Sequence, residues 1–118
     1  MKIKKVCFDI DGVICTKKNK NYKLSKPIIK NINFINKLYE QKYEIILHTA
    51  RFMGRNNDVI KKAEKQGKTL TLKQLKIWGV NYHKIFFGKP SFDIVIDDKN
   101  LHFRENWIKD LKIKLKDK

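Results

Sequence analysis

Cysteine, proline and glycine are scarce in this sequence, and so are acidic side chains and long apolar runs. The two cysteines, Cys7 and Cys15, are too few for a disulfide framework, which argues against a disulfide-stabilised secreted domain and favours the reducing cytoplasm. No apolar run approaches the roughly 18 residues of a membrane-spanning helix, so we expect no membrane segment. The first residues have no long apolar core and no small-residue cleavage site, so we expect no signal peptide.

The charge is strongly one-sided. Lys and Arg number 28 against 12 Asp and Glu, which gives a formal net charge of +16. A domain this basic raises the expectation of nucleic acid or another polyanion as a partner. The lysines are spread along the whole chain, however, so a solvated lysine-rich surface is the simpler interpretation. Such a surface would still draw an anionic substrate toward the protein.

The 118 residues suffice for one domain, which we place at 1–118. Apolar patterning predicts strands at 3–9, 43–49, 84–87 and 93–97, and helices at 27–41, from 56 or 57 to 66, at 71–78 and from about 103. Gly67 is expected to end the second helix, and Thr71 with Gln74 has capping-box spacing for the third. This order predicts an α/β domain whose mostly parallel sheet runs 84–87, 43–49, 3–9, 93–97, with helices on both faces.

Four carboxylates follow two of the predicted strands. Asp9 and Asp11 come after the first strand, and Asp97 and Asp98 come after the last. Turn chemistry explains any one of these residues, but it is a poor explanation for two close pairs in a chain with few acidic side chains. Clustered carboxylates repel unless a cation lies among them, and Mg²⁺ prefers oxygen ligands and often binds substrate phosphate as well. The sequence therefore predicts a metal and phosphate site at the carboxyl end of the sheet.

Four segments, taken in order, resemble the motifs of the haloacid dehalogenase (HAD) superfamily. FDIDGVI at 8–14 resembles motif I, and Thr49 in ILHTAR resembles the motif II hydroxyl. Lys89 in FFGKP resembles the motif III lysine, and VIDDK at 95–99 resembles the Asp-Asp form of motif IV. A lone Asp-x-Asp-Gly would be weak evidence, but the ordered set spans roughly residues 3–100. The resemblance implies a Rossmann-like HAD fold and a phosphatase.

The same resemblance implies a role for each matching residue. Asp9 would be the nucleophile that forms an aspartyl-phosphate, and Asp11 the general acid and then the general base. Thr49 and Lys89 would hold the transferring phosphoryl oxygens. Positive charge around those oxygens is what phosphoryl transfer requires.

The implied cofactor is Mg²⁺. Asp97 would be a direct ligand, with Asp98 beside it or acting through water. The Asp9 carboxylate and the Asp11 backbone carbonyl would complete the protein's share of the metal shell.

A narrower resemblance concerns substrate. YHKIFFGKPSFDIVIDDKN, preceded by TLKQLKIWGV, resembles small HAD proteins associated with bacterial capsule and polysaccharide biosynthesis, which implies a sugar phosphate or related small-molecule ester. We expect Arg51 to contact anionic or hydroxyl groups of the substrate, with a plain surface arginine as the alternative. Residues 13–26 are long enough only for a hairpin flap, so we expect a capless or minimally capped enzyme. A neighbouring subunit of a homo-oligomer could enclose such an exposed site, and the sequence does not decide the oligomeric state.

Two other functions compete with this interpretation. The basic charge favours a nucleic-acid 3′-end phosphatase of the same fold, but no aromatic-plus-basic stacking motif supports it. The second is a catalytically idle binding or regulatory protein that kept the fold. The intact set of Asp9, Asp11, Lys89 and Asp97 argues against that alternative.

Overall fold

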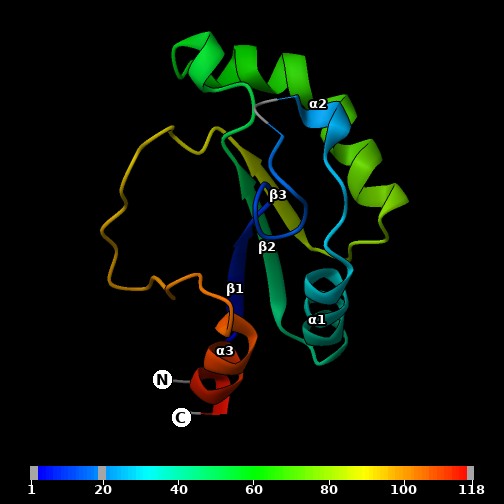
Figure 1. The fold of residues 1–118 in the computed structure, drawn as a ribbon, viewed down its shortest axis with the longest axis vertical. Coiled ribbons are helices and arrows are strands. Elements are labelled where there is room, and N and C mark those ends of the chain that lie inside the picture. Colours follow the sequence, from blue (N-terminus) through cyan, green and yellow to red (C-terminus); the bar gives the residue numbers. More distant parts are fainter. Residues whose placement is uncertain (1–2, 19–20, 117–118) are drawn as a thin grey trace.

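The computed structural model describes residues 3–18 and 21–116, and Figure 1 shows its arrangement. In chain order the strands and α-helices are β1 (Lys5–Asp9), α1 (Ile29–Glu40), β2 (Glu44–Thr49), α2 (Ile60–Ile77), β3 (Lys84–Phe87) and α3 (Trp107–Lys116). Short 3-10 turns lie at Tyr22–Leu24 and Gly54–Asn56.

The sheet contains three parallel strands in the order β1-β2-β3. In this register Cys7 lies opposite Ile46, and Leu47 lies opposite Ile85. Parallel neighbours need crossover connections, and α1 and α2 supply them. The expected α/β class, the three strands and their relative order are therefore confirmed, and the carboxyl ends of β1 and β2 lie side by side.

The predicted fourth strand at 93–97 is wrong. After β3 the chain swings away from the sheet and returns only at α3 (Figure 1), and 93–97 belongs to no strand. Its apolar side chains face solvent: Ile94 is 81% exposed and Ile96 is 96% exposed. Asp97 instead makes a local turn, accepting a 2.9 Å hydrogen bond from the Lys99 N–H. An apolar run becomes a strand only by pairing with a neighbour, and β1 pairs with β2 alone among the described residues.

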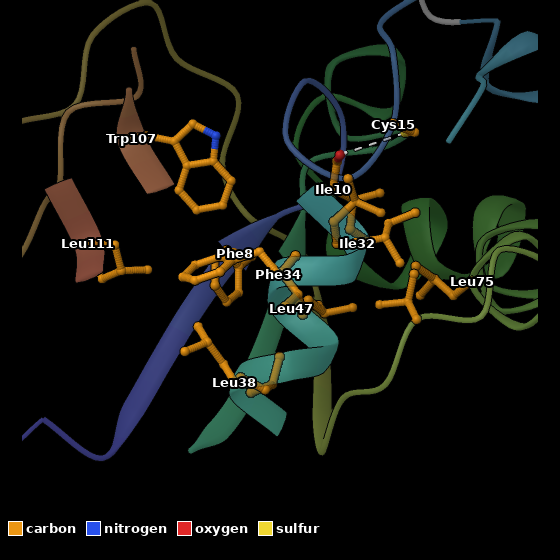
Figure 2. Packing of buried hydrophobic residues seen from close by; sticks show 14 residues of the cluster. Phe8, Ile10, Cys15, Ile32, Phe34, Leu38, Leu47, Leu75, Trp107 and Leu111 are labelled. Carbon is orange, nitrogen blue, oxygen red and sulfur yellow. Dashed lines mark hydrogen bonds between the residues drawn. The ribbon is translucent and has the colours of Figure 1, made fainter. Parts of the chain in front are cut away.

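The core lies against one face of the sheet. Phe8, Ile45 and Leu47 point into a single buried cluster that α1, α2 and α3 all enter, and Figure 2 shows its labelled members. In that cluster the Trp107 ring meets both Phe8 and Phe34 edge-on.

The opposite face of the sheet is open. The strand residues that alternate with the core positions are exposed or half-buried: Cys7, Ile46, His48 and Phe86. We expected helices on both faces of the sheet, but the helices cover one face. Right-handed crossovers that move in one direction across a sheet place their helices on the same side of it.

Helix α2 is continuous, which corrects the prediction of two helices separated at Gly67. Its 18 residues include Gly67 and Thr71 as buried interior positions. A Cβ built on Gly67 would lie 2.3 Å from Cδ2 of Phe52, so the glycine gives Phe52 room to pack rather than ending the helix. No helix in the described part of the chain has the length and apolar content needed to span a membrane.

Candidate functional site

A pocket of about 450 Å³ opens beyond the carboxyl ends of β1 and β2. Its walls come from the end of β1, the loop after Gly12, the turn after β2 and the segment after β3. Its charged lining comprises two carboxylates, Asp9 and Asp11, and five cations: Lys17, Lys18, Arg51, Arg55 and Lys89. Counting formal charges, five minus two leaves an excess of +3, so the pocket favours anions.

Asp9 sits on the pocket floor as the last residue of β1. Its Oδ1 accepts a 3.0 Å hydrogen bond from the Ile10 N–H, and its Oδ2 lies 3.4 Å from Nζ of Lys89. The Asp9 side chain is 31% exposed, so it is both anchored and reachable. The Lys89 backbone N–H donates to the Thr49 carbonyl at 3.1 Å, which fixes the lysine at the end of β2. The structure thus brings together the two residues predicted as nucleophile and phosphate-binding lysine.

Asp11 is paired with Arg51. The arginine Nε lies 3.2 Å and 3.0 Å from the two Asp11 carboxylate oxygens, and Nη2 lies 3.0 Å from Oδ1. The Arg51 side chain is fully buried, whereas that of Asp11 is 18% exposed. A fork-like, charge-assisted contact of this kind fixes orientation as well as charge.

The remaining Arg51 donors are also occupied. Nη1 donates to Thr71 Oγ1 at 3.2 Å and to Gln74 Oε1 at 2.6 Å, and Nη2 donates to Cys15 Sγ at 3.5 Å. A guanidinium has five N–H groups, and these contacts use all of them. Arg51 therefore ties Asp11 to α2 instead of offering a free donor, which differs from its predicted role as a substrate contact.

Thr49 lies beneath the pocket rather than on its surface. The residue is fully buried, and its Oγ1 accepts a 3.0 Å hydrogen bond from the Arg51 backbone N–H. The hydroxyl therefore shapes the turn that carries Arg51. It does not line the pocket as the predicted phosphate contact would.

The loop after β1, which is long enough for a hairpin flap, is tied together where it leaves the sheet and where it returns. The Thr16 N–H donates to the Lys26 carbonyl at 2.9 Å, and the Lys26 N–H donates to Thr16 Oγ1 at 3.0 Å, so the loop closes on itself. Tyr22 connects this loop to α2 and to Arg51. Its carbonyl accepts a 2.7 Å hydrogen bond from Gln74 Nε2, and its ring centroid lies 4.8 Å from the Arg51 guanidinium carbon.

Phe52 lines the pocket in a strained backbone conformation. Its φ is +65°, a left-handed value that a bulky side chain rarely adopts. The Phe52 ring packs against the Tyr22 ring, with a centroid distance of 4.8 Å. It also occupies the space that a side chain at Gly67 would fill. Such strain persists only where the surroundings over-determine it, and here it holds an aromatic wall at the pocket rim.

Burial also perturbs two groups beside the site. Desolvation, followed by the nearby Asp11 carboxylate, raises the pKa of the Cys15 thiol to about 12, so Cys15 is a neutral structural thiol. Burial and then the charge of Lys89 lower the pKa of His48, while Asp9 partly opposes them. His48 is therefore held neutral beside the pocket.

The predicted magnesium ligands are not assembled. Asp97 and Asp98 are exposed on the segment after β3 and do not line the pocket. Asp9 and Asp11 each face a cationic side chain, so neither is an unpaired carboxylate awaiting an ion. Among residues 3–18 and 21–116 no group of three or more His, Cys, Asp or Glu side chains could hold a metal. The residues as placed do not fit Mg²⁺.

Two residues that bind Arg51 and two that line the pocket were not predicted as parts of the site. Gln74 and Thr71 have the spacing of a capping box, but the same i, i+3 spacing puts both side chains on one helix face, where they bind Arg51. Tyr22 and Phe52 carried no signal beyond their aromatic character. A buried arginine needs several acceptors, but the sequence does not show that Arg51 is buried, so it carries no signal for these partners.

Comparison with known proteins supports the fold alone. No protein-family model matches the chain, and no curated protein matches it. A solved crystal structure of a target protein from Vibrio cholerae is similar, with a TM-score of 0.78 and 24% sequence identity. The match covers 97% of this chain and 98% of that one, so the whole arrangement recurs there.

Proposed function

We propose that the protein is a phosphomonoester hydrolase that acts through an aspartyl-phosphate on Asp9. One observation carries the proposal: the Asp9 carboxylate is anchored, reachable and 3.4 Å from Lys89 on the floor of a cationic pocket. The excess of +3 draws a phosphate ester in, and Lys89 lets an anionic nucleophile approach an anionic phosphorus. The ordered HAD-like motifs support the same chemistry.

The reaction takes two steps. Asp9 attacks phosphorus, the bond from phosphorus to the ester oxygen breaks, and protonated Asp11 gives its proton to the leaving alcohol. Asp11, now a carboxylate, then takes a proton from water, which attacks the aspartyl-phosphate and releases inorganic phosphate and free Asp9. Lys89 offsets charge on the phosphoryl oxygens in both steps.

Arg51 has a positioning role in this scheme. Its contacts hold the Asp11 carboxylate in a fixed orientation and stabilise the charge that Asp11 gains when it gives up its proton. Because the guanidinium is buried and its donors are used, Arg51 acts through Asp11 and not on the substrate.

The proposed cofactor is Mg²⁺, on the strength of the motif resemblance and not of the site's geometry. With Asp97 and Asp98 outside the pocket, the arrangement described above does not hold an ion, and none of the steps above depends on one. Metal dependence is therefore a separate element of the proposal, with its own test below.

The proposed substrate is a sugar phosphate or a related metabolite, as the resemblance to capsule and polysaccharide HAD proteins implies. A pocket of about 450 Å³ is in the size range of sites for small molecules. Its concave shape suits a whole metabolite better than an extended polymer strand.

The test is turnover of p-nitrophenyl phosphate by the purified full chain, with and without Mg²⁺. Wild type should release nitrophenolate, and Asp9→Asn should lose at least about a hundredfold in kcat. Asp93→Asn is the matched control, since Asp93 is an exposed carboxylate outside the pocket, and it should retain activity. Absence of turnover in the wild type under both conditions would reject the enzyme and leave a binding protein.

A further inference from the structure

The chain is held in place where it leaves β3 and passes the pocket. Gly88 turns the backbone with φ +100°, a left-handed value that favours glycine. A Cβ built on Gly88 would lie 2.8 Å from Cγ1 of Ile60, so the first residue of α2 packs closely against this turn. The next residue, Lys89, donates its N–H to the Thr49 carbonyl. Two elements, β2 and α2, therefore fix the start of the segment after β3.

A second anchor lies two residues further along. The Ser91 hydroxyl donates to Asp58 Oδ1 at 2.9 Å, and the Ser91 N–H donates to the same oxygen at 3.4 Å. Asp58 follows the turn after β2 and has φ +58°, a conformation that Asp adopts more readily than most residues. These bonds join the turn after β2 to the segment after β3, and both contribute to the pocket wall.

Phe92 is the first residue beyond these anchors, and it lines the pocket. Nζ of Lys89 lies 5.1 Å from the centroid of the Phe92 ring and 3.4 Å from Asp9 Oδ2. The same amine is therefore next to both the proposed nucleophile and the ring. A phosphoryl group that contacts this amine has the ring beside it, and the leaving group is the part of the ester that can cover the ring.

The Phe92 ring is left partly uncovered, unlike the other two rings of the pocket. Tyr22 and Phe52 pack on each other, whereas no ring–ring contact in the described part of the chain involves Phe92. Phe92 is 48% exposed. The apolar side chains further along the segment are exposed as well, but they do not line the pocket. Phe92 therefore offers apolar surface to a ligand at a position that neighbouring elements hold.

We infer that Phe92 determines specificity for the leaving group, and that the preferred substrate is a phosphomonoester whose leaving group is a ring with an apolar face. That face stacks on Phe92. This inference rests on the proposed function and narrows its substrate class. A pyranose ring has such a face, formed by its C–H groups, whereas a flexible open-chain polyol does not present one. A stacking contact of this kind corresponds to about fivefold in affinity.

The kinetic test compares glucose 6-phosphate with sorbitol 6-phosphate. Both are dianionic esters of a primary alcohol on a six-carbon chain, and they differ in whether that chain closes into a ring. Wild type should hydrolyse glucose 6-phosphate with a kcat/KM about fivefold higher, mainly through KM. Turnover of p-nitrophenyl phosphate together with equal kcat/KM for the two sugar esters would overturn the inference and leave the proposed function standing.

The Phe92→Ala variant tests the location. The ratio of the two kcat/KM values should fall to about one, and Phe92→Trp, which keeps an aromatic face, should retain it. The control is Phe86→Ala, which removes a ring of similar exposure, 55%, from β3 outside the pocket and should keep the wild-type ratio. A ratio that stays near fivefold in Phe92→Ala, or that falls equally in both alanine variants, would reject Phe92 as the determinant.

A binding measurement decides the matter if neither sugar ester is hydrolysed. By titration calorimetry, glucose 6-phosphate should bind wild type about fivefold more tightly than sorbitol 6-phosphate. That preference should disappear in Phe92→Ala and persist in Phe86→Ala. Equal affinities in the wild type, or no measurable binding of either ester, would overturn the inference without reference to turnover.

Discussion

Replacing Arg51 tests whether this buried arginine positions Asp11 or binds substrate. Arg51→Met keeps much of the side-chain volume but leaves Asp11, Thr71 and Gln74 without their donors. Breaking a buried charge pair typically costs roughly 3–5 kcal/mol. The Asp11 side chain is 18% exposed, so water can partly replace the guanidinium, and we expect about 3 kcal/mol, at the low end of that range.

That loss is large enough to measure by thermal unfolding. A domain of this size has an unfolding entropy of about 0.25 kcal/mol/K, so Tm should fall by about 12 °C. The double variant Arg51→Met/Asp11→Asn should lose clearly less than the sum of the two single variants, because it removes the uncompensated charge. Additive losses, or a fall in Tm below about 4 °C for Arg51→Met, would refute the pairing.

The kinetic consequence separates the two roles. Arg51→Lys keeps a positive charge but loses the fork that orients Asp11. If Arg51 acts through Asp11, kcat on p-nitrophenyl phosphate should fall by about tenfold or more while KM changes little. A large rise in KM with kcat preserved would instead restore Arg51 as a direct substrate contact.

Three further predictions concern Gly67, His48 and the metal. Gly67→Ala should lower Tm despite the better helix propensity of alanine, because its Cβ would meet the Phe52 ring at 2.3 Å; an unchanged or raised Tm would show that this ring is not packed there. Burial and Lys89 lower the folded-state pKa of His48, so its stabilising contribution is present above about pH 6.5 and is lost as pH falls through the folded value. Tm should accordingly fall between pH 7 and pH 5, and less in His48→Gln; equal falls would contradict the shift. The motif resemblance, unlike the placed residues, predicts that activity vanishes in excess EDTA and returns with Mg²⁺; full activity in EDTA, as the two steps drawn without an ion would allow, would remove the metal from the proposal.

The fold was predictable where local pattern and pairing agree. The strands β1, β2 and β3 are apolar and lead to polar carboxyl ends, and two helical connections fix their order. The segment at 93–97 has an equally apolar pattern, but apolar residues do not specify which edge they pair with, and Ile96 is left in solvent. Gly67 shows the same limit on a helix, because its place is set by Phe52, which is distant in sequence.

The site was predictable in its residue types and less so in its contacts. Spacing placed Asp9 and Lys89 after the carboxyl ends of two strands of one parallel sheet, and they meet across the end of β2, which lies between those strands. It could not count the hydrogen bonds of Arg51, which depend on how α2 packs over the turn after β2. Nor could it place Asp97, whose position depends on a strand pairing that does not form in the described structure.

Trapping the covalent intermediate tests the central proposal most directly. Asp11→Asn keeps the side-chain size but removes the acid and base, so nitrophenolate, a good leaving group, can still depart while hydrolysis of the aspartyl-phosphate slows. After brief exposure to p-nitrophenyl phosphate and an acid quench, mass spectrometry should find one phosphate on the peptide that contains Asp9. The same experiment on Asp9→Asn/Asp11→Asn should find none. Wild-type turnover by Asp9→Asn, or phosphate attached elsewhere, would contradict the account and show that Asp9 is not the nucleophile.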